Sequence, residues 1–136
     1  MAKTETFQCT VVTPERPVLD VPATFVAFPA HDGEMGVLVN RAPLVAKLGA
    51  GPLRVESGEQ KHVLFIDGGF AQMVDNRLTI LTEQAKTAGE IDVPAATRAL
   101  AEAQSAPAAS EAAVLERTRA IKRAKSQIQI AKSHRP

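Results

Sequence analysis

The spacing of hydrophobic and polar positions changes near residue 85. Before that point, apolar residues alternate with polar ones in short runs that glycine and proline separate, as in half-buried strands. After it, alanines and a few larger apolar residues recur at helical spacing, with a single glycine and no aromatic residue. The pattern therefore predicts a β domain over residues 1–86 and a helical domain over residues 87–136.

Alternation is strictest at the start of the β region. Over residues 6–13, Phe7, Cys9 and Val11 share one face, which predicts a half-buried strand. Hairpin turns are expected at residues 57–59 and 75–76. Further strands are expected at 18–21 (an edge strand between two prolines), 24–28, 53–56, 62–67, 70–74 and 78–81. Short strands at this spacing predict an antiparallel β-sandwich or barrel, and we expect the sandwich.

Residues 33–44 interrupt this series. Gly33 and Gly36 lie close together in the segment GEMGVLVNRAPL, and paired glycines are typical of tight turns. We expect a loop here.

Two helices are expected in the second region. Asp92 can cap the first, Pro94 suits its opening turn, and the helix runs on over residues 95–104. Pro107 lies in the break, and the second helix extends from about residue 108 or 110 to 132. The apolar positions expected to face a partner helix are Val93, Ala96, Leu100 and Ala103 on the first helix, and Val114, Ile121, Ile128, Ala124 and Ala131 on the second. Small residues on both sides favour close packing as an antiparallel hairpin.

Charge is distributed unevenly. The whole chain has 16 lysines and arginines against 15 acids, whereas residues 111–136 carry seven basic residues and two acids. The narrow apolar stripes bury little surface, so the hairpin must dock on the sandwich, on a partner, or on each in turn. A solvated helix face is the alternative explanation of the basic residues.

Candidate chemistry is sparse. The single cysteine, Cys9, excludes an intrachain disulfide and is expected inside the sheet as a small apolar residue. His31, His62 and His134 are isolated from other metal ligands in the sequence, and His31-Asp32 is expected to be an exposed loop pair. No phosphate-binding glycine loop, apolar run long enough for a membrane span or signal peptide is found. We expect a soluble intracellular protein with no catalytic, cofactor or metal residues.

Three ordered motifs resemble one family. They are Gly33–Leu44, FIDGGFA at residues 65–71, and LTILTEQA at 78–85 followed by Glu90-Ile91-Asp92. In this order and spacing they are similar to the epsilon subunit of F-type ATP synthase. The family's first motif is usually G-x-x-G-x-x-P-x-H-x-P-L, and this chain departs from it with Val39 and Arg41 at the proline and histidine positions.

The resemblance implies a non-catalytic rotor subunit of the proton-translocating ATP synthase. It implies that the sandwich joins the gamma subunit to the c-ring and couples rotation to ATP synthesis, with Glu34 and Arg41 on the c-ring side. It further implies that the hairpin regulates ATP hydrolysis by reaching the alpha/beta catalytic head. Its expected contacts there are Arg117, Arg119, Lys122, Arg123 and Lys125. Neither nucleic acid nor membrane insertion is implied, and the expected place is the cytoplasmic face of the bacterial inner membrane.

Some members of this family bind ATP through an I-D-x-x-R-A motif at the start of the first helix. Here Ile91-Asp92 is followed by Ala95 at the arginine position, so no cofactor is expected.

Two other hypotheses stay open at the level of the sequence. One is a stand-alone ligand-binding β-sandwich with the hairpin as a dimerisation arm. The other is a small RNA-binding protein that uses the basic helix, although no aromatic residue accompanies its basic residues for base stacking.

Overall fold

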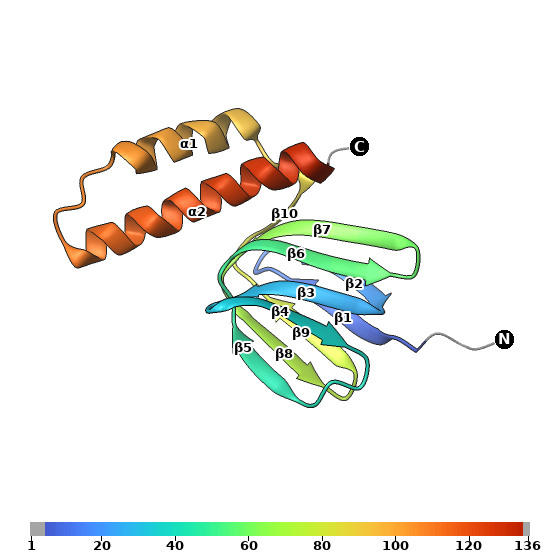
Figure 1. Ribbon diagram of the computed structural model, residues 1–136. Helices are drawn as coiled ribbons and strands as arrows, with labels where there is room; N and C mark the ends of the chain where they lie inside the picture. Colours follow the sequence, from blue (N-terminus) through green and yellow to red (C-terminus); the bar gives the residue numbers. More distant parts are fainter. Residues whose placement is uncertain (1–4, 135–136) are drawn as a thin grey trace.

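The computed structural model describes residues 5–134, which form two stacked β-sheets with a helical hairpin at one end (Figure 1). The first sheet has the order β2 (Pro17–Ala23), β1 (Phe7–Val12), β9 (Arg77–Leu81), β8 (Phe70–Val74), β5 (Leu44–Lys47). The second has the order β10 (Ala85–Thr87), β7 (Gln60–Asp67), β6 (Ala50–Ser57), β3 (Phe25–Ala30), β4 (Gly33–Leu38). The predicted sandwich is confirmed, and β2 lies at an edge as expected.

Neighbouring strands run antiparallel, with the exception of β1 and β9, which pair in parallel. Alternate residues of each strand point between the sheets, so Phe7, Cys9 and Val11 are buried as predicted. Burial raises the pKa of the Cys9 thiol to about 12, and the nearby charge of Asp20 adds to the shift. Cys9 is therefore a protonated core residue at neutral pH.

The two predicted hairpin turns are present. In the β8–β9 turn, Asp75 and Asn76 have φ of 50° and 57°, a conformation that aspartate and asparagine tolerate better than most residues. Gly58, with φ of 64°, provides the turn between β6 and β7. Turn chemistry thus set the register of both hairpins.

The expected loop over residues 33–44 is wrong. Residues 33–38 form the edge strand β4, which pairs with β3 along its whole length, and Leu44 begins β5. Gly36 is needed for packing, because a Cβ there would lie 3.0 Å from the ring of Phe25. Glycine inside a strand often marks the close approach of another group, here the ring of Phe25, which explains how a strand could resemble a loop.

The helical hairpin follows a short 3₁₀ turn, η1 (Ala88–Glu90). Helix α1 (Val93–Ser105) begins as predicted, since the Asp92 carboxylate accepts the Ala95 N–H at 3.0 Å. Helix α2 (Glu111–His134) is capped by the Ser110 hydroxyl, which accepts the Ala113 N–H at 3.1 Å. The two helices lie side by side and antiparallel (Figure 1).

The C-terminal half of α2 docks on β6, β7 and η1. Buried residues from both parts form one cluster there, namely Phe65, Ala88, Ile91, Ile130 and Ala131. The predicted α2 stripe is partly wrong: Ala124 and Ala131 are buried, but Val114 is 47% exposed and Ile130 takes the central position. The reason is that the sandwich covers only one half of α2, whereas the N-terminal half meets α1 alone.

Candidate functional site

An apolar patch lies on the outer face of the first sheet. It consists of Val45, Phe70, Val74 and Leu81, which are 72%, 54%, 38% and 50% exposed. Phe70 and Leu81 are direct cross-strand partners, and Val45 pairs with Gln72, which lies between Phe70 and Val74. The four apolar side chains therefore share one face, with Gln72 among them. We call this set the outer apolar face. Large exposed apolar patches on soluble proteins mark interaction sites.

Sequence reasoning missed the outer apolar face, although a signal was present. In strands 70–74 and 78–81, the positions that alternate with buried Ala71, Met73, Leu78 and Ile80 include Phe70, Val74 and Leu81. A half-buried strand normally carries polar residues there. Apolar residues on both faces of these strands therefore indicate that a partner covers the outer face of the sheet.

Arg41 lies at one margin of this face. It is in the turn between β4 and β5, where its N–H donates to the Leu38 carbonyl at 3.3 Å. Leu38, before this turn, is also strongly exposed, and Val45 follows it in β5. The turn is fixed by Asn40, whose N–H donates to Asn76 Oδ1 at 2.6 Å. The Arg41 side chain is exposed, and its Nη1 donates to the Ala42 carbonyl at 3.4 Å.

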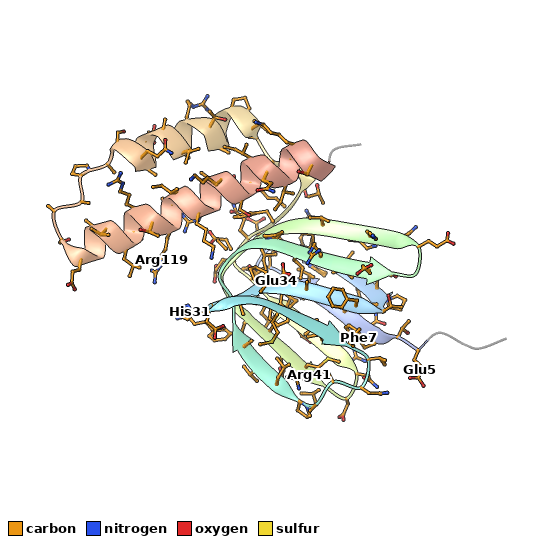
Figure 2. The ribbon with its side chains drawn as sticks, viewed as in Figure 1. Glu5, Phe7, His31, Glu34, Arg41 and Arg119 are labelled. Carbon is orange, nitrogen blue, oxygen red and sulfur yellow. The ribbon has the colours of Figure 1, made fainter. Side chains whose placement is uncertain are left out.

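Glu34 lies at the other end of β4, beside the His31-Asp32 tip of the β3–β4 hairpin (Figure 2). It is half exposed and accepts a hydrogen bond from Arg54 Nη2 at 2.9 Å. At a rise of about 3.3 Å per residue, Glu34 and Leu38 lie about 13 Å apart along β4, and Arg41 follows in the next turn. The two predicted c-ring residues therefore lie towards opposite ends of β4.

The five predicted basic contacts of α2 fall into two groups. Arg117 donates to the Gln104 carbonyl at 2.8 Å and so links α2 to the end of α1. Arg123 donates to Asp67 at 2.7 Å and links α2 to the sandwich. The remaining three are exposed on the surface of the docked hairpin, namely Arg119, Lys122 and Lys125.

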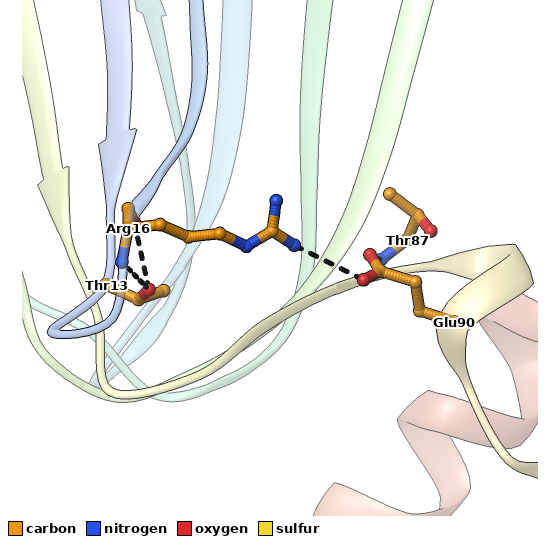
Figure 3. Close-up of polar contacts among 4 residues, drawn as sticks. All are labelled: Thr13, Arg16, Thr87 and Glu90. Carbon is orange, nitrogen blue, oxygen red and sulfur yellow. Dashed lines mark hydrogen bonds and ion pairs between the residues drawn. The ribbon is translucent and has the colours of Figure 1, made fainter.

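The segment that joins the sandwich to the hairpin is held by Glu90 (Figure 3). Its carboxylate accepts the Thr87 backbone N–H at 3.0 Å and lies 3.4 Å from Arg16 Nη2 in the β1–β2 turn. The Thr87 N–H, and to a smaller extent the charge of Arg16, hold the pKa of Glu90 below its ordinary value.

Residues 5–134 contain no cluster of three or more histidine, cysteine or acidic side chains that could hold a metal ion. His31 and Asp32 are exposed in a turn as expected, His62 lies in β7, and the side chain of His134 lies outside the described part of the chain. No helix among the described residues is long and apolar enough to cross a membrane.

Comparisons with known proteins agree with this architecture. Residues 6–88 match the family described as ATP synthase, Delta/Epsilon chain, beta-sandwich domain. The ATP synthase epsilon chain of Rhodopirellula baltica is 41% identical over 121 residues, covering 89% of this chain and 94% of that one. The epsilon chain of Symbiobacterium thermophilum is 44% identical over 113 residues, covering 82% of this chain and 80% of that one.

A solved structure extends the match to the hairpin. A chain of the Euglena gracilis mitochondrial ATP synthase, in an assembly of OSCP, F1 and c-ring, superposes with a TM-score of 0.80 at 28% identity. That match covers 95% of this chain and 82% of the other. Sequence and fold together define one class, the small non-catalytic subunits of rotary ATP synthases. The chain belongs to the ATP synthase delta/epsilon family.

Proposed function

We propose that the chain is an epsilon-type subunit of the ATP synthase central stalk, which joins gamma to the c-ring, couples rotation to ATP synthesis and regulates ATP hydrolysis. The observation that carries this proposal is the outer apolar face on a sandwich of this family. Four exposed apolar side chains on one sheet face would be costly to leave in water, and a permanent stalk partner would cover them.

Gamma is the partner proposed for the outer apolar face. Interfaces combine apolar side chains with polar or charged ones at their rims. On this face, Phe70 and Leu81 form an apolar pair, and Lys47 lies beside Phe70 on β5. Arg41 at the margin fits the rim of the same contact. We therefore assign Arg41 to the junction between gamma and the c-ring side rather than to the contact that Glu34 makes.

Glu34 is the residue proposed to face the c-ring. It is exposed at a hairpin tip, and its present partner Arg54 is itself half exposed, so exchange for an arginine of another chain costs little. Because Glu34 and Arg41 lie towards opposite ends of β4, we propose that they serve different contacts.

The hairpin is the proposed regulatory element. Released from the sandwich, it would carry its basic residues to acidic segments of the alpha/beta catalytic head and slow ATP hydrolysis. Arg119, Lys122 and Lys125 are available without rearrangement, because all three are exposed while the hairpin is docked. Charges of this kind act mainly on the rate of encounter and on specificity.

We propose that the hairpin works without bound ATP. Ala95 lies at the motif arginine position and lines a cavity of about 250 Å³ between the helices, in which Asp92 is already engaged as the α1 cap. Calorimetric titration with ATP tests this, and binding at micromolar concentration would contradict it.

The proposed place of the protein is peripheral, on the cytoplasmic face of a bacterial inner membrane.

The central test is binding to gamma by the full chain. Phe70→Glu should weaken the complex by about 30-fold or more, since it places a charge within the apolar contact. Leu115→Glu is the matched control, because Leu115 is 51% exposed on α2 and lies away from the sheet. If Phe70→Glu binds gamma normally, the assignment of the face is wrong. A wild-type chain that forms a homodimer and ignores gamma would favour the dimerisation-arm hypothesis instead.

A further inference from the structure

Arg123 and Asp67 form the one ion pair between the hairpin and a sheet strand among the described residues. Arg123 Nε lies 2.7 Å from Asp67 Oδ2, and the two side chains are 37% and 25% exposed. Asp67 ends β7, its backbone N–H donates to the Gln84 carbonyl at 3.2 Å, and the Gly68-Gly69 turn follows. The backbone of Asp67 is therefore fixed, and the ion pair is partly shielded from water.

The surroundings of Arg123 depend on this carboxylate. Arg123 shares the cavity between α1 and α2 with Lys86, Asp92, Gln127 and several alanines. Lys86 has the same charge as Arg123, and the Asp92 carboxylate already accepts the Ala95 N–H. Without Asp67, the docked hairpin would hold the charges of Arg123 and Lys86 in a half-buried cavity, with no free carboxylate in its lining to offset them.

We propose that Asp67 and the acidic surface of the hairpin's partner compete for Arg123, so that this one contact sets the balance between the docked and released hairpin. The inference rests on the proposed regulatory function and specifies its control. Docked, Arg123 is bound to Asp67; released, it becomes free for a carboxylate of the partner. Arg119, Lys122 and Lys125 do not change in this way, because they are exposed in the docked form.

Competition predicts unequal effects of the two single substitutions. Asp67→Asn removes the docked contact and leaves Arg123 intact, so release becomes easier and the released hairpin keeps its full charge. Arg123→Gln also weakens docking, but it removes one charge from the contact with the partner. The first variant should therefore inhibit ATP hydrolysis more strongly than the wild type, and the second should change inhibition less.

The docking half of the proposal is tested on the full isolated chain by hydrogen exchange. Asp67→Asn and Arg123→Gln should each speed exchange of the α2 amides about three- to tenfold, while strands β1 and β9 stay unchanged. The charge-reversed pair Asp67→Arg with Arg123→Asp should restore slow exchange. Asp75→Asn, which removes a carboxylate from the distant β8–β9 turn, is the matched control. Unchanged α2 exchange in both single variants would overturn the proposal.

The competition half is tested by ATP hydrolysis in the assembled ATP synthase. Stronger inhibition by Asp67→Asn than by Arg123→Gln supports it, and equal effects overturn it. Deleting the hairpin after residue 88 tests the proposed regulatory function separately. If that deletion leaves hydrolysis unchanged, the regulatory function of the hairpin fails, whereas the exchange result still decides whether Asp67 holds Arg123.

Discussion

Arg16 and Glu90 connect the first turn of the sandwich to the segment that carries the hairpin, with Nη2 and Oε2 3.4 Å apart (Figure 3). They are 74 positions apart in the sequence. Glu90 also accepts the Thr87 N–H, so one carboxylate fixes both the end of β10 and its distance from the β1–β2 turn. The hairpin therefore starts from a defined point on the sandwich.

Removing the Glu90 carboxylate should destabilise this segment. Glu90→Ala loses the cap on Thr87 and the contact with Arg16, and we expect a cost of about 1 kcal/mol in urea unfolding. Glu90→Gln keeps a cap acceptor and loses only an exposed ion pair, so it should cost about 0.5 kcal/mol or less. An equal cost for both variants would show that the cap contributes nothing.

The contribution of Glu90 should depend on pH in one direction. Its pKa is lowered in the folded protein from the ordinary value of 4.5. The stabilisation is therefore complete above about pH 4.5 and is lost as the pH falls through the lower, folded-state pKa. The difference in unfolding free energy between wild type and Glu90→Gln should shrink in acid and stay constant between pH 6 and 8. A difference that grows in acid would contradict the assignment.

Ile130 should decide whether the hairpin docks. It is 3% exposed in the cluster with Phe65, so Ile130→Ala should weaken docking by about 2–4 kcal/mol while the sandwich stays folded. Ile128→Ala is the control, since Ile128 is only half-buried. Faster hydrogen exchange along α2 is the measurement. If Ile128→Ala has the larger effect, α2 docks through the predicted stripe that contains Ile128 and not through Ile130.

Gly69 should be the least replaceable glycine. Its φ is 104°, and a Cβ would collide with the carbonyl oxygen of Leu81. Gly69→Ala should cost about 3 kcal/mol or more in urea unfolding. Gly58→Ala, with φ of 64° and open space around it, should cost about 1 kcal/mol. Similar costs at both positions would mean that the β7–β8 turn relaxes.

Glu34 and Arg41 should affect different partners. Glu34→Gln is expected to weaken binding to the c-ring, and Arg41→Gln to weaken binding to gamma, each by about 0.5–1 kcal/mol and more at low salt. Titrations of each variant against each partner measure the four affinities. Loss of affinity for the same partner in both variants would contradict the separation of the two sites.

Much of the fold followed from local signals. Alternation around Cys9 located the first strand, asparagine and glycine located both hairpin turns, and Asp92 located the start of α1. These features depend on residues close in the sequence, which is why a pattern can reveal them. The order of the strands could not be predicted from these local signals, because the pairing of β1 with β9 joins residues almost 70 positions apart.

The misses have a common cause, which is contact with distant parts of the chain. Gly36 suggested a loop because the ring of Phe25, which occupies the space beside it, belongs to another strand. Val114 suggested a core position because the sequence does not show where the sandwich ends along α2.

The parallel pairing of β1 with β9 has a consequence for biosynthesis. Residues 7–12 leave the ribosome early but meet their neighbour only when residues 77–81 have been made, so the first sheet stays open until then. Helices α1 and α2 follow all ten strands of the described chain. Both sheets can therefore be complete before the helical hairpin has been made.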